Sequence, residues 1–254
     1  MTSGYRAPSA TLFATELPRA ALDLVALVGA SPLLATAPRG DGHPVLVLPG
    51  LLTGDPATKL LRTVLRTLGH DVSGWTLGTN RGATSDVVQG LRTRLERLHR
   101  ESGQRVSLVG WSLGGVFAQE LARASPGSVR NLVTLGSPVL RRSGWTQQLS
   151  KVLDEATYLP RAASRAPRVW AEPGPLRVPA TSVYSRTDGI VEWSTCTYAA
   201  GERRENVQVR GSHLGMAHNP AVLWLVADRL AQAEDAWGRF RAPLLLRPLF
   251  PRTT

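Results

Sequence analysis

The sequence predicts an α/β domain with a mostly parallel central sheet and helices on both of its faces. Short apolar runs alternate with segments whose apolar residues recur every three or four positions, and this alternation is typical of such sheets. The 254 residues are 43% hydrophobic and 19% charged, a composition that favours a folded globular chain. We therefore expect a single domain spanning residues 1–254.

In the first half of the chain, glycines and prolines mark where the predicted elements end. Pro44 and Pro49 bound the first apolar run, while Gly69 and Gly103 stand where a helix C-cap glycine belongs. The expected elements are a strand over 45–48, a helix over 57–68, a strand over 71–77, a helix over 85–100 and a strand over 105–109.

The second half continues the alternation after one long interruption. The expected elements are a helix over 113–124, strands over 129–135, 180–184 and 207–209, and a helix over 220–236. Between these elements, residues 139–177 are rich in proline and arginine and show only weak helical patterns. We expect this segment to be an insertion over the sheet, a lid or cap. The tail 238–254 is rich in arginine, proline and leucine.

The N-terminal segment 1–43 is expected to be helical. Leu17, Ala21, Leu24 and either Leu27 or Val28 recur at the spacing of an amphipathic helix whose apolar face packs on the domain. The apolar residues 20–34 also resemble the core of a signal peptide, but Asp23 interrupts them. The sequence therefore favours a cytoplasmic protein, with export as the alternative.

The charge of the chain limits its partners. The net charge is +11, supplied almost entirely by arginine, since Lys59 and Lys151 are the only lysines. The arginines are scattered and do not alternate with aromatic residues, so we expect no nucleic-acid partner. Weak association with an anionic membrane surface stays open. Cys196 is the only cysteine, which excludes an internal disulfide and a cysteine-based metal site.

One short motif predicts a nucleophile. The run Gly110-Trp-Ser-Leu-Gly114 follows a predicted strand directly and precedes a predicted helix. A serine in that position occupies a tight, strained turn, and glycines two residues to either side let the backbone close around it. The start of the helix also places backbone N–H groups beside a reacting carbonyl. Ser112 is the candidate nucleophile.

A serine nucleophile needs a base and an acid that orients the base. His213 follows the strand over 207–209 and Asp188 follows the strand over 180–184, so both should lie at the edge of the sheet that carries Ser112. His218 is the rival base and Glu192 the rival acid.

The motif around Ser112, the chain order Ser112-Asp188-His213 and the glycine-rich loop after the first strand resemble the α/β-hydrolase superfamily, and bacterial esterases and lipases in particular. The resemblance covers roughly residues 44–236. It implies an oxyanion hole formed by the backbone N–H groups of Leu51 and Leu113. The sequence has Pro49-Gly50 where lipases often have His-Gly, which leaves Leu52 as an alternative donor to Leu51.

The resemblance implies a serine carboxylic-ester hydrolase that needs neither a metal nor an organic cofactor. An apolar lid favours lipid-like esters as the small-molecule substrates. We expect Trp111, Asn80 and Trp145 to contact the substrate. An acyltransferase with the same three residues, or a non-catalytic basic binding module on the same fold, remains an alternative.

Overall fold

The computed structural model describes residues 8–139 and 175–254. The expected lid over 139–177, with Trp145 in it, falls almost entirely outside these described residues. Residues 1–7 of the expected N-terminal helical segment also fall outside them, and the other predicted elements lie within them.

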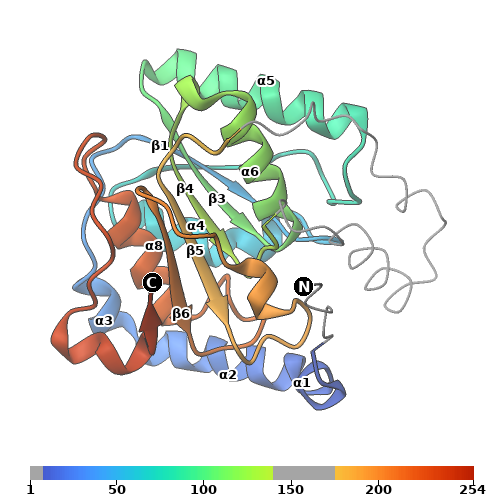
Figure 1. Ribbon diagram of the computed structural model, residues 1–254, viewed down its shortest axis with the longest axis vertical. Coiled ribbons are helices and arrows are strands. Elements are labelled where there is room, and N and C mark those ends of the chain that lie inside the picture. Colours follow the sequence, from blue (N-terminus) through green and yellow to red (C-terminus); the bar gives the residue numbers. More distant parts are fainter. Residues whose placement is uncertain (1–7, 140–174) are drawn as a thin grey trace.

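A seven-stranded sheet forms the centre of the molecule (Figure 1), with the strand order β2-β1-β3-β4-β5-β6-β7. The strands are β1 Pro44–Leu48, β2 Asp71–Gly74, β3 Val106–Trp111, β4 Val129–Leu135, β5 Ala180–Ser185, β6 Arg204–Val209 and β7 Arg252–Thr253. All neighbours pair in parallel except β6 and β7. The structure therefore confirms the predicted mostly parallel sheet.

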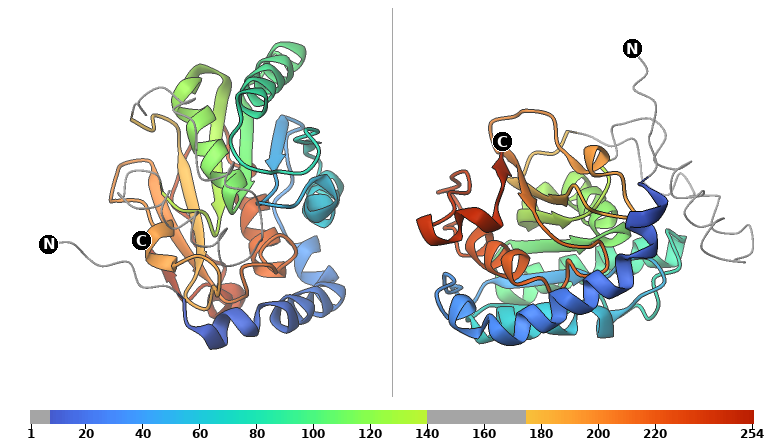
Figure 2. Two further views of the ribbon diagram at one scale, coloured as in Figure 1. Left: turned by 90° about the vertical axis from the view of Figure 1, so that its right-hand side faces the viewer. Right: turned by 90° about the horizontal axis from the view of Figure 1, so that it is seen from below.

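Helices cover both faces of this sheet (Figure 2). The α-helices are α1 Ala10–Ala14, α2 Glu16–Gly29, α3 Ser31–Ala35, α4 Lys59–Thr67, α5 Ser85–Ser102, α6 Leu113–Ala124 and α8 Pro220–Leu230. The short 3-10 helices are η1 Asp55–Thr58, η2 Pro126–Ser128, η4 Trp193–Cys196 and η5 Leu244–Leu249.

Alternate residues of β1 show how the two layers of the core arise. Val45 and Val47 belong to an apolar cluster with α4 and α8, whereas Leu46 and Leu48 belong to a second cluster with α5 and α6. Successive strand residues point to opposite faces of a sheet, so both faces must be covered when every residue is apolar. This is why the strand reads as a continuous apolar run.

The C-terminal tail adds an element that the sequence did not predict. Strand β7 pairs antiparallel with β6, through Val207 with Thr253 and Gln208 with Arg252. A two-residue strand is too short to leave a periodic pattern in the sequence. The tail thus closes one edge of the sheet.

The N-terminal segment is helical, as expected, but α2 packs with the opposite face. Leu17 and Val28 are 73% and 79% exposed, whereas Glu16 is buried at 3% exposure. Leu27 packs against the apolar core, as expected, but Leu17, Ala21, Leu24 and Val28 face solvent, so the expectation is wrong for these four residues. Polar contacts of the opposite face also hold the helix in place. Within the described ranges, no helix is both long and apolar enough to cross a membrane.

Candidate active site

Ser112 lies in the tight turn between β3 and α6, in a strained conformation with φ 53° and ψ −123°. Its backbone N–H donates a 2.9 Å hydrogen bond to the carbonyl of Leu135 on the neighbouring strand β4. A Cβ atom at Gly114 would overlap the carbonyl of Leu48, so only glycine fits there. A non-glycine residue at positive φ costs free energy, and such strain is typical of functional turns.

His213 and Asp188 form a buried pair at the same end of the sheet. The His213 Nδ1 and Asp188 Oδ2 atoms are 2.7 Å apart. The other carboxylate oxygen of Asp188 accepts N–H hydrogen bonds from Ile190, at 2.9 Å, and Val191, at 2.7 Å. Both oxygens of the carboxylate are thus occupied, which fixes its orientation. The opposite ring nitrogen of His213, Nε2, stays available for a proton.

The surroundings of His213 raise its pKa above the ordinary value of 6.5. Burial by itself lowers the pKa, because it disfavours the charged imidazolium. The attraction and the hydrogen bond of Asp188 oppose that effect, and the charge of Glu16 adds to them. The net direction is upward, so the site stabilises a protonated imidazole.

Trp111 and Gly136, which lie beside the turn of Ser112, also lie close to His213. The indole N–H of Trp111 donates a 3.1 Å hydrogen bond to the carbonyl of His213. A Cβ atom added to Gly136, directly after Leu135, would lie about 3 Å from both His213 Nδ1 and Asp188 Oδ2. The turn of Ser112 and the His213–Asp188 pair are therefore parts of one site. Within the described part of the chain, the Ser112 hydroxyl has no hydrogen-bond partner.

The two rival residues have other roles. The Nε2 atom of His218 lies 2.9 Å from the carbonyl of Ala20, which ties this ring to helix α2. Glu192 accepts a 3.4 Å hydrogen bond from the Ser194 N–H at the start of η4. The histidine and acid that the structure brings together are thus His213 and Asp188.

The loop after β1 determines which backbone N–H groups are free. Leu52, at φ 58°, donates its N–H to the carbonyl of Asn80 at 2.7 Å. Leu51 donates no backbone hydrogen bond among the described residues. Leu113 is the first residue of α6, where a helix N–H has no partner within the helix. Of the two alternatives in the loop, Leu51 is therefore the one whose N–H can serve a ligand.

Asn80 and Trp111, which we expected to contact substrate, both support the site's loops. Asn80 is fully buried; its side chain donates to the carbonyl of Pro49 at 2.9 Å and accepts from the N–H of Gly82 at 3.2 Å. Trp111 is 5% exposed and holds His213 as described. These contacts position backbone around Ser112.

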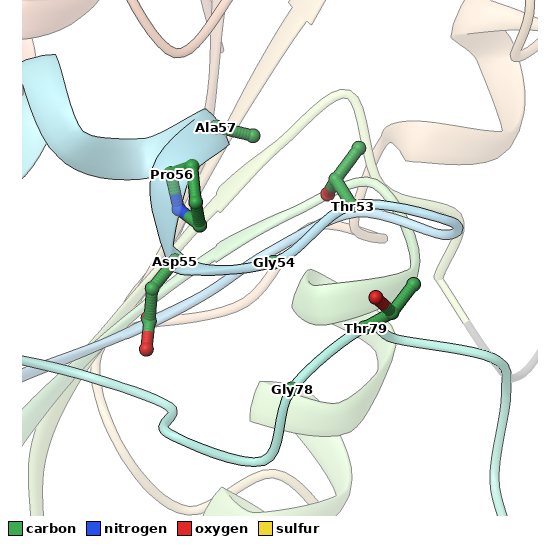
Figure 3. Close-up of a pocket in the computed structure, with 7 residues that line it drawn as sticks. All are labelled: Thr53, Gly54, Asp55, Pro56, Ala57, Gly78 and Thr79. Atoms are coloured by element: carbon green, nitrogen blue, oxygen red, sulfur yellow. The ribbon is translucent and has the colours of Figure 1, made fainter.

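A hollow of about 470 Å³ lies beside this loop, as Figure 3 shows. It is lined by Thr53, Gly54, Asp55, Pro56, Ala57, Gly78 and Thr79. The hollow lies between the loop after β1 and the loop after β2. Ser112, Asp188 and His213 are not among its lining residues, so it lies to one side of them.

A second carboxylate–imidazole–hydroxyl chain lies at the other end of the sheet. Asp41 contacts His43 Nδ1, and His43 Nε2 lies 2.7 Å from the Ser107 hydroxyl. His43 and Ser107 are both 0% exposed, so no substrate reaches this hydroxyl. The arrangement is structural. No cluster of three or more metal-binding side chains occurs in the described ranges, 8–139 and 175–254.

Sequence reasoning missed two acidic residues of α2 that contact the site's loops, Glu16 and Asp23. They are seven positions apart and therefore lie on the same face of the helix. That spacing, in a stretch where Arg19 is the only other charged residue, was the signal that could have revealed a polar inner face.

This fold, with a strained serine after β3, an aspartate after β5 and a histidine after β6, is the α/β-hydrolase fold. Solved structures with the same fold include lipase B of Aspergillus fumigatus, with a TM-score of 0.51 and 16% identity over 80% of this chain and 56% of that chain. A metagenome-derived lipolytic enzyme, described with LipS and LipT, has a TM-score of 0.54 and 14% identity over 76% of this chain and 93% of that one.

A third such structure is Cfl2 of Burkholderia cenocepacia, with a TM-score of 0.52 and 15% identity over 77% of this chain and 90% of that one. The chain spans just over half the length of the fungal lipase. The sequence matches no protein-family model and no curated protein. At these identities the likeness shows the fold alone.

Proposed function

We propose that this protein is a serine hydrolase of carboxylic esters that acts through an acyl-enzyme on Ser112. The observation that carries the proposal is the buried 2.7 Å pair of His213 and Asp188, held beside a serine in a strained strand-to-helix turn. The fold shared with the lipase and the lipolytic enzyme named above supports it.

In the proposed reaction, the ester carbonyl is attacked by the Ser112 oxygen while His213 Nε2 takes the hydroxyl proton. Asp188 holds the ring and stabilises the imidazolium that forms, consistent with the raised pKa of His213. The tetrahedral intermediate then breaks its bond to the alcohol, which leaves with the proton from His213. Water, deprotonated by the same histidine, attacks the acyl-enzyme and releases the acid, and the proton returns to Ser112.

The backbone N–H groups of Leu51 and Leu113 are the proposed oxyanion donors. Both are free in the described structure, and Leu113 begins helix α6, whose dipole favours negative charge at that end. A single such donor contributes about 3 kcal/mol to the transition state in related chemistry. Fixing Leu51 through the Asn80 contacts keeps its N–H in place without reorganisation during the reaction.

For the substrate we propose a lipid-like ester with a hydrophobic acyl chain. The hollow beside the loop of Leu51 contains Pro56 and Ala57 as well as the Thr53 and Thr79 side chains, and its volume of about 470 Å³ suits a chain of several carbons. Each methylene group buried there would contribute about 0.8 kcal/mol to binding.

The test is hydrolysis of p-nitrophenyl esters from acetate to palmitate by wild-type protein and by Ser112→Ala. We expect release of p-nitrophenol that the substitution abolishes, with a preference for longer chains than acetate. A fluorophosphonate that labels Ser112 in the wild type alone would show the activated nucleophile directly. No turnover of any chain length and no labelling, with a folded protein, would overturn the proposal.

The same assay separates hydrolysis from acyl transfer. With an added alcohol acceptor, a hydrolase gives mainly free acid, whereas an acyltransferase gives mainly the new ester. A protein that labels with fluorophosphonate but releases acid only slowly, and passes its acyl group to the alcohol, would replace the hydrolase assignment by the acyltransferase.

A further inference from the structure

Helix α2 contacts both loops of the proposed active site through one buried carboxylate. Glu16 is 3% exposed and begins the helix. Its Oε1 accepts a 2.7 Å hydrogen bond from the N–H of Gly189, and its Oε2 accepts a 3.0 Å hydrogen bond from the N–H of Leu214. These donors are the residues directly after Asp188 and His213. One side chain thus bridges the loop of the acid and the loop of the base.

Arg19 completes this contact on the same face of the helix. Its guanidinium donates to Glu16 Oε1 at 2.8 Å and to the carbonyl of Thr187 at 2.6 Å, one residue before Asp188. Both oxygens of Glu16 therefore accept only from N–H donors, which is the pattern of an ionised carboxylate. The arginine also compensates the cost of burying that charge.

Asp23 ties the same helix to the histidine loop alone. Its Oδ2 accepts from the N–H and the hydroxyl of Ser212, at 3.3 and 3.1 Å, and its Oδ1 accepts from the side-chain amide of Asn219 at 2.7 Å. Within the described part of the chain, none of its hydrogen bonds reaches the Asp188 loop. Asp23 therefore offers a matched control for a residue that supports the fold without bridging the two loops.

We propose that Glu16 is a positioning residue for the reaction: by accepting from Gly189 and Leu214 it sets the distance and orientation between Asp188 and His213. This inference rests on the proposed function, and it extends the site to a helix outside the sheet. The charge of Glu16 also acts on the ring, because it is one of the groups that raise the pKa of His213.

The test is Glu16→Gln, which keeps the shape but turns one acceptor into a donor facing an N–H group. We expect the His213 pKa, followed by NMR of the ring Cε1–H, to fall below the wild-type value. We expect kcat to fall about tenfold or more while KM stays within about twofold, because Glu16 does not contact the proposed substrate pocket. The charges that act on the His213 ring are those of Asp188 and Glu16, while Arg19 contacts Glu16 and Asp23 contacts Ser212 beside the histidine.

Two controls complete the experiment. Asp23→Asn is expected to lower the melting temperature but to keep the His213 pKa. If Glu16→Gln does not fold, Glu16→Asp replaces it: the charge remains but the shorter side chain cannot reach both loops, so kcat should fall with little change in the pKa. A folded Glu16→Gln with wild-type pKa, or Glu16→Asp with wild-type kcat, would overturn the role. The NMR titration needs no turnover, so it tests Glu16 even if the protein hydrolyses no ester.

A different observation concerns the opposite face of α2, whose residues are apolar and exposed to solvent. They are Leu17, Ala21, Leu22, Leu24, Val25 and Val28. All charged residues of the helix form hydrogen bonds with the loops after β5 and β6, so the outer face carries no charge; they are Glu16, Arg19 and Asp23. A helix with this polarity has its apolar side turned to solvent, and Figure 2 shows it lying along the outside of the molecule.

The loops that α2 holds carry exposed cations. Arg186 lies beside Thr187, which Arg19 contacts, and Arg210 lies two residues before Ser212, which Asp23 contacts. These two exposed arginines lie on loops that contact α2, and the chain as a whole carries a net charge of +11. An uncharged apolar helix face on a positively charged chain matches the surface of an anionic bilayer, where cations meet headgroups and apolar side chains enter the acyl boundary.

We infer that this face of α2 docks on an anionic phospholipid surface, with the helix lying in the plane of the membrane. The test is co-sedimentation with vesicles of phosphatidylcholine, with and without 30% phosphatidylglycerol (roughly the anionic content that attracts basic segments). We expect binding to the anionic vesicles, weakened about tenfold or more in the triple variant Leu17→Ser, Val25→Ser, Val28→Ser.

The matched control is Leu60→Ser, which changes an exposed leucine on α4 and should bind like the wild type. Equal binding by the wild type and the triple variant, or no binding to anionic vesicles, would overturn the docking surface. So would a dimer in light scattering that the triple variant abolishes, because the face would then belong to a second copy of the chain.

Discussion

The indole N–H of Trp111 donates a 3.1 Å hydrogen bond to the backbone carbonyl of His213, although the two residues are 102 positions apart. Trp111 ends strand β3 and precedes Ser112, so the residue next to the proposed nucleophile holds the loop of the proposed base. Their rings lie 6.1 Å apart between centroids. The tryptophan therefore couples the positions of Ser112 and His213, a role that is distinct from the substrate contact expected from the sequence.

Replacing Trp111 by phenylalanine should affect catalysis more than stability. The variant loses one neutral hydrogen bond, which contributes about 1 kcal/mol, but it also frees the His213 loop. We expect kcat on a p-nitrophenyl ester to fall about tenfold with little change in KM. Trp224→Phe is the control, because the indole of Trp224, on α8, donates a 3.2 Å hydrogen bond to the Thr36 hydroxyl at the end of α3. Equal kcat losses in the two variants would contradict the coupling.

The pH dependence of ester hydrolysis should follow the neutral fraction of His213. A general base acts only when deprotonated, and the pKa of His213 is raised above 6.5, so kcat/KM should increase with pH through a midpoint above 6.5. In Asp188→Asn, burial still lowers the pKa of His213, but the negative charge of Asp188 that opposed this effect is gone. The midpoint of the kcat/KM profile should therefore move to lower pH. The maximal rate should fall by about 10⁴ because the ring loses its orienting partner. Profiles of kcat/KM between pH 5 and 9 give both quantities, and an unmoved midpoint in the variant would contradict the pairing.

Asn80 should be needed to hold the loop that contains Leu51 in its conformation. Asn80→Ala removes the hydrogen bonds to Pro49 and Gly82 at a site with no exposure to solvent, which costs about 1–3 kcal/mol of the free energy of unfolding. If the loop positions an oxyanion donor, kcat should fall about equally for short and long acyl esters. Denaturation in urea and kcat across the ester series provide the measurements. A loss confined to KM for one chain length would instead mark Asn80 as a substrate contact.

Much of the fold could be predicted because buried parallel strands and helices leave different periods in the sequence. The positions of Ser112, Asp188 and His213 followed from that reading, since each comes directly after a strand and parallel strands end at a common edge. The structure brings Asp188 and His213 together and places Ser112 in the strained turn that its flanking glycines predicted.

The packing of α2 could not be read from apolar spacing. The rule that apolar faces pack inward assumes that burial of apolar area dominates. Here Glu16, Arg19 and Asp23 form hydrogen bonds with loop backbone that is far away in the sequence. Nothing in the segment 16–29 itself names those partners. Strand β7 was not predicted for a related reason. Its pairing with β6 depends on where the C-terminal tail meets the sheet, and its own two residues carry no pattern that shows this.

The histidine pair at the far end of the sheet predicts how stability changes in acid. His70 is 4% exposed, and its ring packs edge to face against the ring of His43, with 5.5 Å between the ring centroids. Burial, together with repulsion from His43, lowers the pKa of His70 to about 4. Because this is below the value of 6.5 for the unfolded chain, the unfolded state takes up the proton first. The free energy of unfolding should therefore fall as pH decreases from 6.5 to 4, by about 2 kcal/mol at pH 5.

His70→Phe should remove this contribution. Both ring nitrogens of His70 are buried without a hydrogen-bond partner in the described part of the chain, so phenylalanine loses no bond there. We expect similar free energies of unfolding for the two proteins at pH 7.5, and a variant that is more stable than the wild type by about 1–2 kcal/mol at pH 5. Urea denaturation at the two pH values measures the difference. A wild type and variant that lose stability in parallel would show that His70 takes up its proton without unfolding, and that its pKa in the folded protein is not lowered.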